Sequence, residues 1–223
     1  VIALSSPDVY LENVRQREGV RCIEVPMERQ ISLFKDIVSL WRLYRVFRKE
    51  KPQMVHSLTP KAGLLCMMAG WLARVPVRIH TFTGLVFPTA KGLKKQILMA
   101  TDRLTCACAT HIIPEGEGVR SDLLNNKITS KPLKVLGYGN IRGIDLDVYN
   151  PDSVDAQRLL NEEVPSPSVT FISVGRLVGD KGINELVEAF VRLNGENPNS
   201  RLVLVGPEEH DLDPLKPETL QKI

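Results

Sequence analysis

The sequence predicts an α/β protein built on parallel β-sheets. Short runs rich in Val, Ile and Leu alternate with segments of helical periodicity along the 223 residues, and this alternation is typical of a parallel sheet covered on both faces. Hydrophobic residues make up 43% and charged residues 25% of the chain, which is enough apolar material for a packed core. The length suits one large domain or two modest ones.

The strands are predicted in the short Val/Ile/Leu-rich runs. In chain order these are 1–6, 20–25, 54–58, 77–82, 111–114, 134–138, 169–174 and 201–205. Two helices can be placed by their starts. Thr59 is a good N-cap, and Pro60 suits the first helical position because an N–H there has no helical partner anyway. A second helix follows Lys181 and Gly182, where apolar residues recur at the spacing of one buried face: Ile183, Leu186, Val187, Phe190 and Val191.

A domain boundary is expected near Tyr149, which divides the chain into residues 1–148 and 149–223. Residues 143–151 look like a connector, and 151–167 is polar and rich in Pro and Ser. The second part then holds two strands and one helix, which bury too little surface for a finished domain. We therefore expect the chain to end before this domain does. The first residue is Val rather than Met, which suggests further sequence upstream.

Composition and charge argue against several classes of protein. A net charge of +3, from 29 Lys and Arg against 26 Asp and Glu, does not indicate a nucleic-acid binder. The four cysteines contain no CxxC pair, so we expect reduced thiols in a cytoplasmic protein and no zinc site. The longest apolar run, 62–73, is shorter than the about 20 residues that span a bilayer. We expect a soluble protein that can still lie on a membrane.

The first candidate site follows the strand at 169–174. Gly175 ends the strand, Arg176 and Lys181 lie in the next loop, and a helix begins after Gly182. Ligands of open parallel sheets bind beyond the carboxyl ends of strands, and helix N-termini attract anions. A guanidinium and an ammonium in this loop suit a diphosphate. The alternative is a solvated loop whose cations bind nothing.

The second candidate site follows the strand at 54–58. His56, Thr59 and Lys61 lie where this strand gives way to a helix, and together they suit a polar substrate. Alternatively, Thr59 only caps the helix and His56 is a hydrogen-bonded residue at the strand end.

The third candidate site follows the strand at 77–82. Histidine ordinarily ionises near neutral pH, so His80 is a candidate acid or base. Strand alternation puts His80 and Phe82 on one side and Thr81 and Thr83 on the other. A structural role for His80 is the alternative.

Residues 31–49 predict a basic amphipathic helix. Its apolar side carries Phe34, Ile37, Val38, Trp41, Tyr44 and Phe47, and its cations are Lys35, Arg42, Arg45 and Lys49, with Arg48 and Lys51 beside them. We expect the apolar stripe to pack on a sheet. The alternative is contact of these cations, and of a second cluster at Lys91, Lys94 and Lys95, with an anionic membrane surface.

Seven segments taken together resemble the bacterial family 4 glycosyltransferases, which have the GT-B fold and whose closest-looking members build capsule, lipopolysaccharide or O-antigen. They are VIALSSP, VHSLTPKAGLL, RIHTFTGLVF, PEGEGVRSDLL, GYGNIRGIDLDVYNP, SVGRLVGDKGINELVEAF and LVLVGP. The resemblance implies an α/β, GT-B-like fold of two Rossmann-like domains with parallel sheets, the second one incomplete. The first domain is then expected to bind the acceptor and the second to bind the nucleotide-sugar donor.

The resemblance also assigns residues to the reaction. It implies retention of the anomeric configuration and no metal or other cofactor, because cations act on the leaving diphosphate. Arg176 and Lys181 match the family's phosphate-binding pair and are expected to be catalytic. Three glycines complete the expected donor site: Gly175, Gly182 and Gly206. The expected acceptor side comprises His56, Thr59, Lys61, Thr83 and Gly84; relatives often carry His where Thr83 stands, so backbone contacts of Thr83 and Gly84 are the expectation.

Two departures from the family pattern bear on activity. Relatives begin with a further strand, a Gly-containing loop and a helix, and they continue past Ile223 to a pair of glutamates spaced E-x7-E. We therefore expect this chain to be a fragment and a poor catalyst by itself. The intact protein is expected to transfer a sugar, from a UDP-sugar, to a lipid-linked or growing glycan at the inner face of the cytoplasmic membrane. The alternatives are a non-hydrolysing sugar-nucleotide epimerase and a non-catalytic membrane-associated scaffold.

Overall fold

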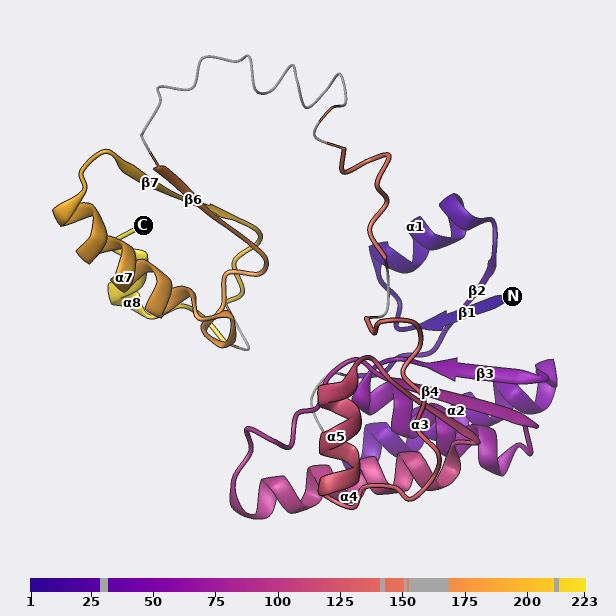
Figure 1. Ribbon diagram of the computed structural model, residues 1–223. Helices are drawn as coiled ribbons and strands as arrows, with labels where there is room; N and C mark the ends of the chain where they lie inside the picture. The colour runs from indigo at the N-terminus through magenta and orange to yellow at the C-terminus, as the bar shows by residue number, and fades with distance from the viewer. Residues whose placement is uncertain (29–31, 141–142, 151, 153–168, 211–212) are drawn as a thin grey trace. The chain divides into compact units, whose positions relative to one another are not determined.

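A computed structural model describes residues 1–28, 32–140, 143–150, 152, 169–210 and 213–223. The chain divides into two compact units, Val1–Ile144 and Asp145–Ile223. The polar segment 151–167 lies outside the described residues apart from Asp152. Figure 1 shows each unit as a layered arrangement of strands and helices. Every strand pair among the described residues is parallel, as predicted.

The first unit contains two parallel sheets. One pairs β1 (Ile2–Ser5) with β2 (Arg21–Glu24). The other has the order β3-β4-β5, with β3 at Met54–Ser57, β4 at Val77–Phe82 and β5 at His111–Pro114. The register between β3 and β4 pairs Ser57 with His80. Because parallel strands end at the same edge, the loops that follow β3 and β4 are neighbours.

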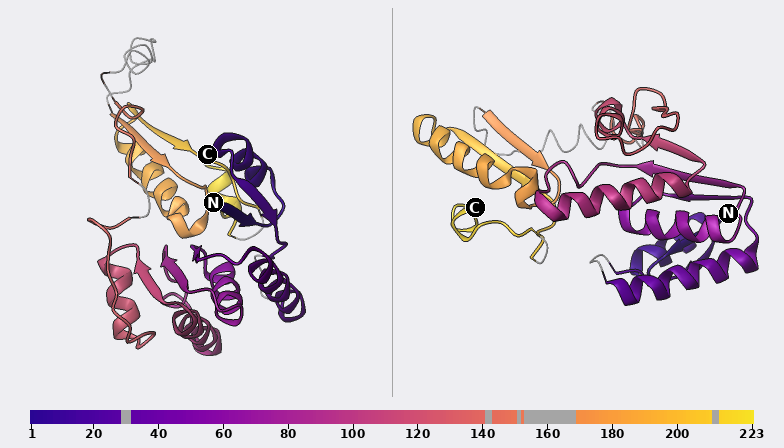
Figure 2. Two further views of the ribbon diagram at one scale, coloured as in Figure 1. Left: turned by 90° about the vertical axis from the view of Figure 1, so that its right-hand side faces the viewer. Right: turned by 90° about the horizontal axis from the view of Figure 1, so that it is seen from below.

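Helices connect and follow these strands in the described part of the first unit. They are α1 (Val9–Glu18), α2 (Leu33–Glu50), α3 (Pro60–Leu72), α4 (Gly92–Cys108) and α5 (Glu117–Asn125). Figure 2 shows α2, α3 and α4 side by side, with α3 packing against both of the others. The strands lie between this layer and α1 (Figure 1). The core lies between the helical layer and the strands and includes Phe47, Met67, Phe82 and Leu123.

The second unit is a single β-α-β arrangement with a short extension. Strand β6 (Val169–Val174) pairs with β7 (Ser200–Val205), and between them lie the short 3₁₀ helix η1 (Gly179–Lys181) and helix α7 (Ile183–Glu196); a short helix α8 (Pro217–Leu220) follows. The predicted face of α7 is confirmed in part. Ile183 and Val187 are buried and Leu186 packs beside them, whereas Val191 is exposed.

The strand predicted at 134–138 is wrong. Next to this region only Leu133 forms a bridge, to Ile112 of β5, and no strand follows in the described residues up to Asn140. Gly137, Gly139 and Asn140 have φ of 57°, 94° and 76°. Backbone in this left-handed region turns the chain instead of extending it. The apolar run therefore lies in a turn.

The sequence analysis predicted the wrong side of α2 to be buried. The buried residues of this helix are Ser39, Leu43 and Phe47, and only Phe47 belongs to the predicted stripe. At about 3.6 residues per turn, these three form one face and Phe34, Ile37 and Trp41 lie on the opposite one. Phe34, Ile37 and Trp41 are exposed. The helix thus presents apolar residues both to the core and to solvent.

Candidate functional site

Gly175 and Gly206 bring the two strand ends of the second unit into close contact. The N–H of Gly175 donates to the carbonyl oxygen of Val205, and the N–H of Leu177 to that of Pro207. A Cβ on Gly206 would lie only 1.7 Å from the carbonyl oxygen of Gly175, and Gly206 has a φ of 151°. Both facts require glycine at position 206. The contact joins the loop that carries Arg176 to the loop that follows β7.

Arg176 lies in this pair of loops with its guanidinium accessible. Its side chain is about half exposed, at 51%, and its Nη1 lies 3.4 Å from Oε2 of Glu209. The parallel register explains the pair, because β6 and β7 end together at Val174 and Val205. An ion pair between partly exposed groups contributes about 0–1 kcal/mol to stability. The pair therefore orients Arg176 and leaves its guanidinium accessible to an anionic ligand. Glu209 is a residue of this site that the sequence did not indicate.

Lys181 and Gly182 lie at the junction between η1 and α7. Lys181 is exposed. Gly182 has a φ of 71°, a left-handed conformation that lets the chain turn from η1 into α7. The N–H of Asp180 donates to Oδ2 of Asp213, at 2.6 Å. This carboxylate accepts the hydrogen bond of an N–H at the start of η1, so that N–H is not open to an anionic ligand. Asp213, also missed from the sequence, thus fixes the loop that carries Lys181.

The carboxyl ends of β3 and β4 carry two hydrogen-bonded pairs on opposite faces of the sheet. Nε2 of His56 lies 2.8 Å from Oγ1 of Thr81, and Oγ of Ser57 lies 2.8 Å from Nδ1 of His80. Strand alternation, as predicted, separates the faces that carry His80 and Thr81. His56 is therefore a hydrogen-bonded strand-end residue, one of the two roles left open by the sequence, and it remains exposed.

His80 is buried against helix α3. Only 1% of the residue is exposed, and its ring makes an edge contact with Phe82 at 4.5 Å between centroids. A Cβ on Gly63 of α3 would lie 2.3 Å from the ring, so glycine makes room for it. Burial, with a smaller contribution from neighbouring His56, lowers the pKa of His80 to about 4. His80 is thus a neutral structural residue at physiological pH.

Thr59, Thr83 and Gly84 line the loops that follow β3 and β4. Thr59 occupies the N-cap position of α3 as predicted, but its side chain makes no capping hydrogen bond. Oγ1 of Thr83 donates to the carbonyl oxygen of Leu58, at 3.3 Å, which links the two loops. Gly84 has a φ of 132°, a conformation that favours glycine. These residues therefore share one edge of the sheet.

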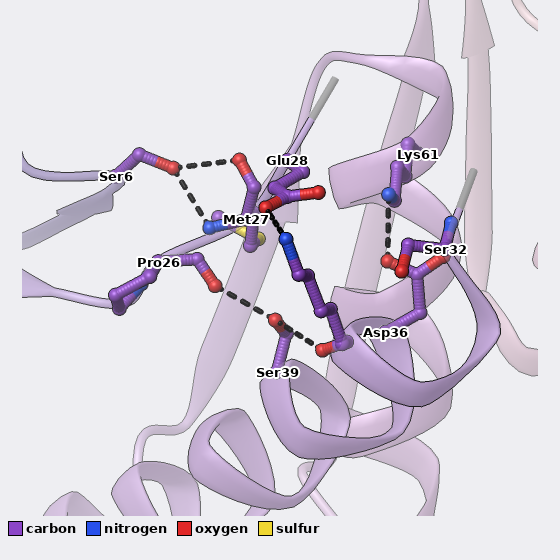
Figure 3. Close-up of polar contacts among 9 residues, drawn as sticks. Ser6, Pro26, Met27, Glu28, Ser32, Asp36, Ser39 and Lys61 are labelled. Carbon is purple, nitrogen blue, oxygen red and sulfur yellow. Dashed lines mark hydrogen bonds and ion pairs between the residues drawn. The ribbon is translucent and has the colours of Figure 1, made fainter. Parts of the chain in front are cut away.

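Lys61 is held by an ion pair to helix α2. Its Nζ lies 2.6 Å from Oδ1 of Asp36, and both side chains are about four-fifths buried, at 19% and 18% exposure. Oδ2 of Asp36 accepts a hydrogen bond from the N–H of Ser32, just before α2 begins. Figure 3 shows this contact beside the loop that follows β2. Lys61 therefore joins the starts of α2 and α3, a structural role that the sequence did not indicate.

The loop after β2 is fixed by short polar contacts in the same region. Oγ of Ser6 donates to the carbonyl oxygen of Met27 and accepts from its N–H, each at 2.9 Å. Oγ of Ser39 donates to the carbonyl oxygen of Pro26 at 2.7 Å (Figure 3). The ends of β1 and β2 and the first turns of α2 thus form one connected edge.

Within the described ranges, no three His, Cys, Asp or Glu side chains come together as a metal site would require. None of the helices in this part of the chain combines the length and the apolar character needed to cross a bilayer.

Family models match both parts of the chain. Residues 1–139 match a model described as "Glycosyl transferase 4-like domain", and residues 160–222 match one described as "Glycosyl transferases group 1". The first match covers the unit that contains His56 and Thr83, and the second covers the loop that contains Arg176 and Lys181.

Two curated proteins are similar in sequence. The chain is 34% identical over 187 residues to the capsular polysaccharide biosynthesis glycosyltransferase CapM of Staphylococcus aureus, covering 82% of this chain and 48% of that protein. It is 31% identical over 199 residues to the UDP-Gal:alpha-D-GlcNAc-diphosphoundecaprenol alpha-1,3-galactosyltransferase of Escherichia coli, covering 86% of this chain and 50% of that protein. The chain thus spans about half the length of the curated relatives it matches.

Solved structures share the fold at low sequence identity. Alr3699/HepE of Anabaena, in complex with UDP and glucose, aligns with a TM-score of 0.68 at 14% identity, over 91% of this chain and 52% of that one. The UDP-GlcNAc 2-epimerase of Neisseria meningitidis, bound to UDP-GlcNAc, aligns with a TM-score of 0.60 at 18% identity, over 100% of this chain and 59% of that one.

These similarities agree with the architecture of the described residues. The fold class predicted from the sequence, α/β and GT-B-like with parallel sheets, is confirmed. The structural neighbours include transferases and epimerases, so the fold by itself does not separate these two activities. The family model over residues 1–139 does distinguish the families. The chain belongs to the family 4 glycosyltransferases.

Proposed function

We propose that the protein containing this chain transfers a sugar from a nucleotide-sugar donor, a UDP-sugar, to a lipid-linked or growing glycan in surface polysaccharide synthesis. The family match and the printed functions of the two curated relatives support this proposal. Complexes of a structural neighbour with UDP, with UDP and glucose and with UDP-glucose support the choice of donor. The setting proposed for the reaction is the cytoplasmic face of the membrane.

The observation that carries the proposal is the accessible pair of cations beyond the carboxyl end of β6. Arg176 and Lys181 are both exposed, and they lie on a loop held by the Gly175–Gly206 contact and by Asp213. In the proposed reaction the bond between the anomeric carbon and the diphosphate oxygen breaks. Negative charge then grows on the leaving diphosphate, and the two cations stabilise it without a metal ion.

The remaining assignments divide the work between the two units. Gly175, Gly182 and Gly206 shape the donor loop, while His56, Thr59 and the backbone of Thr83 and Gly84 lie at the edge proposed to face the acceptor. The new bond joins the anomeric carbon to an acceptor hydroxyl oxygen, whose proton is released. The proposal includes retention of the anomeric configuration. Lys61 is the weakest of the acceptor assignments because its ammonium group is paired with Asp36.

Transfer by the full-length protein, assayed with donor and acceptor, tests this function. Replacing Arg176 with Ala is expected to lower turnover by about 100-fold or more, because the charge stabilisation of the leaving group is lost. Arg192→Ala is the matched control: Arg192 is an exposed cation of the same unit, paired with Glu188 on α7, and its loss is expected to leave turnover unchanged. Undiminished transfer by the Arg176 variant would contradict the assignment.

Product analysis with the donor alone separates the transferase from an epimerase. The proposal predicts no epimerised sugar or sugar nucleotide in the absence of acceptor. It also predicts that an added glycan acceptor becomes extended by one sugar, with the stereochemistry of the donor linkage retained. Formation of an epimer without acceptor would instead assign the epimerase activity.

A further inference from the structure

Among the described residues, Glu209 is the carboxylate that pairs with Arg176. Its Oε2 lies 3.4 Å from Nη1 of Arg176, and its side chain is about four-fifths buried, at 20% exposure, whereas that of Arg176 is half exposed. Because the guanidinium is the more exposed of the two groups, it can turn towards a ligand while the carboxylate stays in place.

The backbone is held on both sides of Glu209. Before it, the N–H of Leu177 donates to the carbonyl oxygen of Pro207. After it, the carboxylate of Asp213 accepts a hydrogen bond from the N–H of Asp180. Both donors belong to the loop between β6 and α7, and β6 and β7 end at the same edge of their sheet (Figure 1). The segment after β7 is therefore tied to the cationic loop, which keeps the carboxylate of Glu209 beside it.

Lys181, the second cation of this loop, has no comparable partner in the part of the chain that the structure describes. No carboxylate there lies within ion-pairing distance of its ammonium group, which is exposed. Glu209 thus acts on one of the two cations, and its effect on a ligand should depend on Arg176.

A diphosphate bound by Arg176 brings like charges together. A guanidinium contacts phosphate oxygens at about 2.7–2.9 Å, so the diphosphate lies close to a carboxylate that contacts the same guanidinium. The two anions repel each other, and more strongly where protein partly excludes water. The pair with Glu209 also has to loosen before the guanidinium can offer two parallel N–H groups to a phosphate. Both effects oppose binding.

The repulsion is larger for the product of the proposed reaction than for the donor. When the bond between the anomeric carbon and the diphosphate oxygen breaks, its electron pair stays on the oxygen. The terminal phosphate of UDP therefore carries a negative oxygen that the UDP-sugar lacks. A fixed carboxylate beside Arg176 weakens the binding of UDP more than the binding of the donor.

We propose that Glu209 holds Arg176 in the absence of nucleotide and competes with UDP for it, so that UDP leaves after the sugar has been transferred. Glu209 is then a positioning residue that acts through Arg176. The inference rests on the proposed function, because it needs a diphosphate at Arg176. It goes beyond orientation of the guanidinium, since a residue that only orients Arg176 strengthens the binding of UDP, whereas a competitor weakens it.

Calorimetric titration of the full-length protein with UDP tests this competition. Glu209→Gln keeps the size of the side chain and a hydrogen-bond acceptor but removes the charge, and it is expected to bind UDP about tenfold more tightly. The dissociation rate of UDP, measured by stopped flow, should fall by a similar factor. In the transfer assay, the inhibition constant of UDP should fall more than the KM of the donor. Glu209→Ala is the second variant and is expected to bind UDP more tightly as well.

Glu208→Gln is the matched control variant. It removes the same charge one residue away, where the carboxylate of Glu208 lies 3.8 Å from Nε2 of His210. Its UDP affinity is expected to stay within about twofold of the wild type. In the Arg176→Ala background, Glu209→Gln should no longer tighten UDP binding. Circular dichroism spectra and thermal unfolding confirm that each variant is folded.

Three results would overturn the competition. They are UDP affinity that is unchanged or weaker in both Glu209 variants, an equal gain in Glu208→Gln, and a gain that persists undiminished without Arg176. A wild-type protein that does not bind UDP would overturn the proposed function together with this inference. UDP binding that Arg176→Ala weakens, without a gain in the Glu209 variants, would overturn this inference alone.

Discussion

Individual side chains at the strand ends divide into structural groups and groups open to a ligand. His80 and Lys61 are held within the first unit, by Ser57 and by Asp36 respectively. Arg176 and Lys181 are exposed. Residue type does not separate these classes, because a histidine and a lysine near a strand end fit either role. Burial and partners separate them, and both depend on chain segments distant in the sequence.

The buried His80 predicts a pH dependence of stability. Its pKa is about 4 in the folded chain, against an ordinary histidine value of 6.5, so between these values the unfolded state binds more protons. The contribution of His80 to the free energy of unfolding should therefore fall by about 3 kcal/mol in total as pH drops from 6.5 towards 4. Burial raises the pKa of Asp102 to about 6, which changes stability in the opposite direction over the same range. The loss due to His80 is therefore measured as the difference in urea unfolding between the wild-type protein and His80→Gln from pH 8 to 5.

A proton NMR titration of the His80 ring checks the cause directly. The ring signal, assigned by its absence in His80→Gln, should stay that of neutral imidazole at pH 5.5. A midpoint near the ordinary value of 6.5 would show that the ring is not held in the neutral form.

Among the elements, the strands were predictable and the exposed face of α2 was not. The predicted ends of β4, β5 and β6 match the structure. The run at 134–138 has similar composition but contains Gly137, and turn geometry prevails there. Helix α2 carries apolar residues on two faces, and periodicity alone cannot say which of them meets the core. The packing of Leu43 and Phe47 decides it.

The ion pair between α2 and α3 predicts a coupling free energy. Lys61 and Asp36 are largely buried at the starts of these helices, so removing either partner leaves the other charge poorly solvated. Asp36→Asn and Lys61→Met are each expected to lower the free energy of unfolding by about 1–3 kcal/mol. The double variant should lose less than the sum, with a coupling of about 1 kcal/mol.

Urea unfolding of the four proteins of this double-mutant cycle provides the measurement. Additive losses would show that the pair does not join the helices. Lys61 would then remain a candidate for the acceptor side.

For the molecule as a whole, the sequence identified both strand-end regions but not the contacts that build them. The loop from Gly175 to Gly182 was recognisable because strand, cations and helix follow one another along the chain. Glu209 and Asp213 were missed because they reach this loop from beyond β7, more than 30 residues away. Because β6 and β7 end at the same edge of their sheet, residues that shortly follow either strand are neighbours. This rule could have indicated Glu209 from the sequence.

In the proposed function, Arg176 and Lys181 bind a diphosphate. Calorimetric titration of the full-length protein with UDP tests it most directly, because binding needs no acceptor and no catalysis. Arg176→Ala and Lys181→Ala should each weaken UDP binding by about tenfold to 100-fold, as expected for the loss of about 1.5–3 kcal/mol in a charge-assisted contact, while Arg192→Ala binds UDP like the wild type. UDP affinity that is the same in all four proteins would show that neither Arg176 nor Lys181 binds the diphosphate.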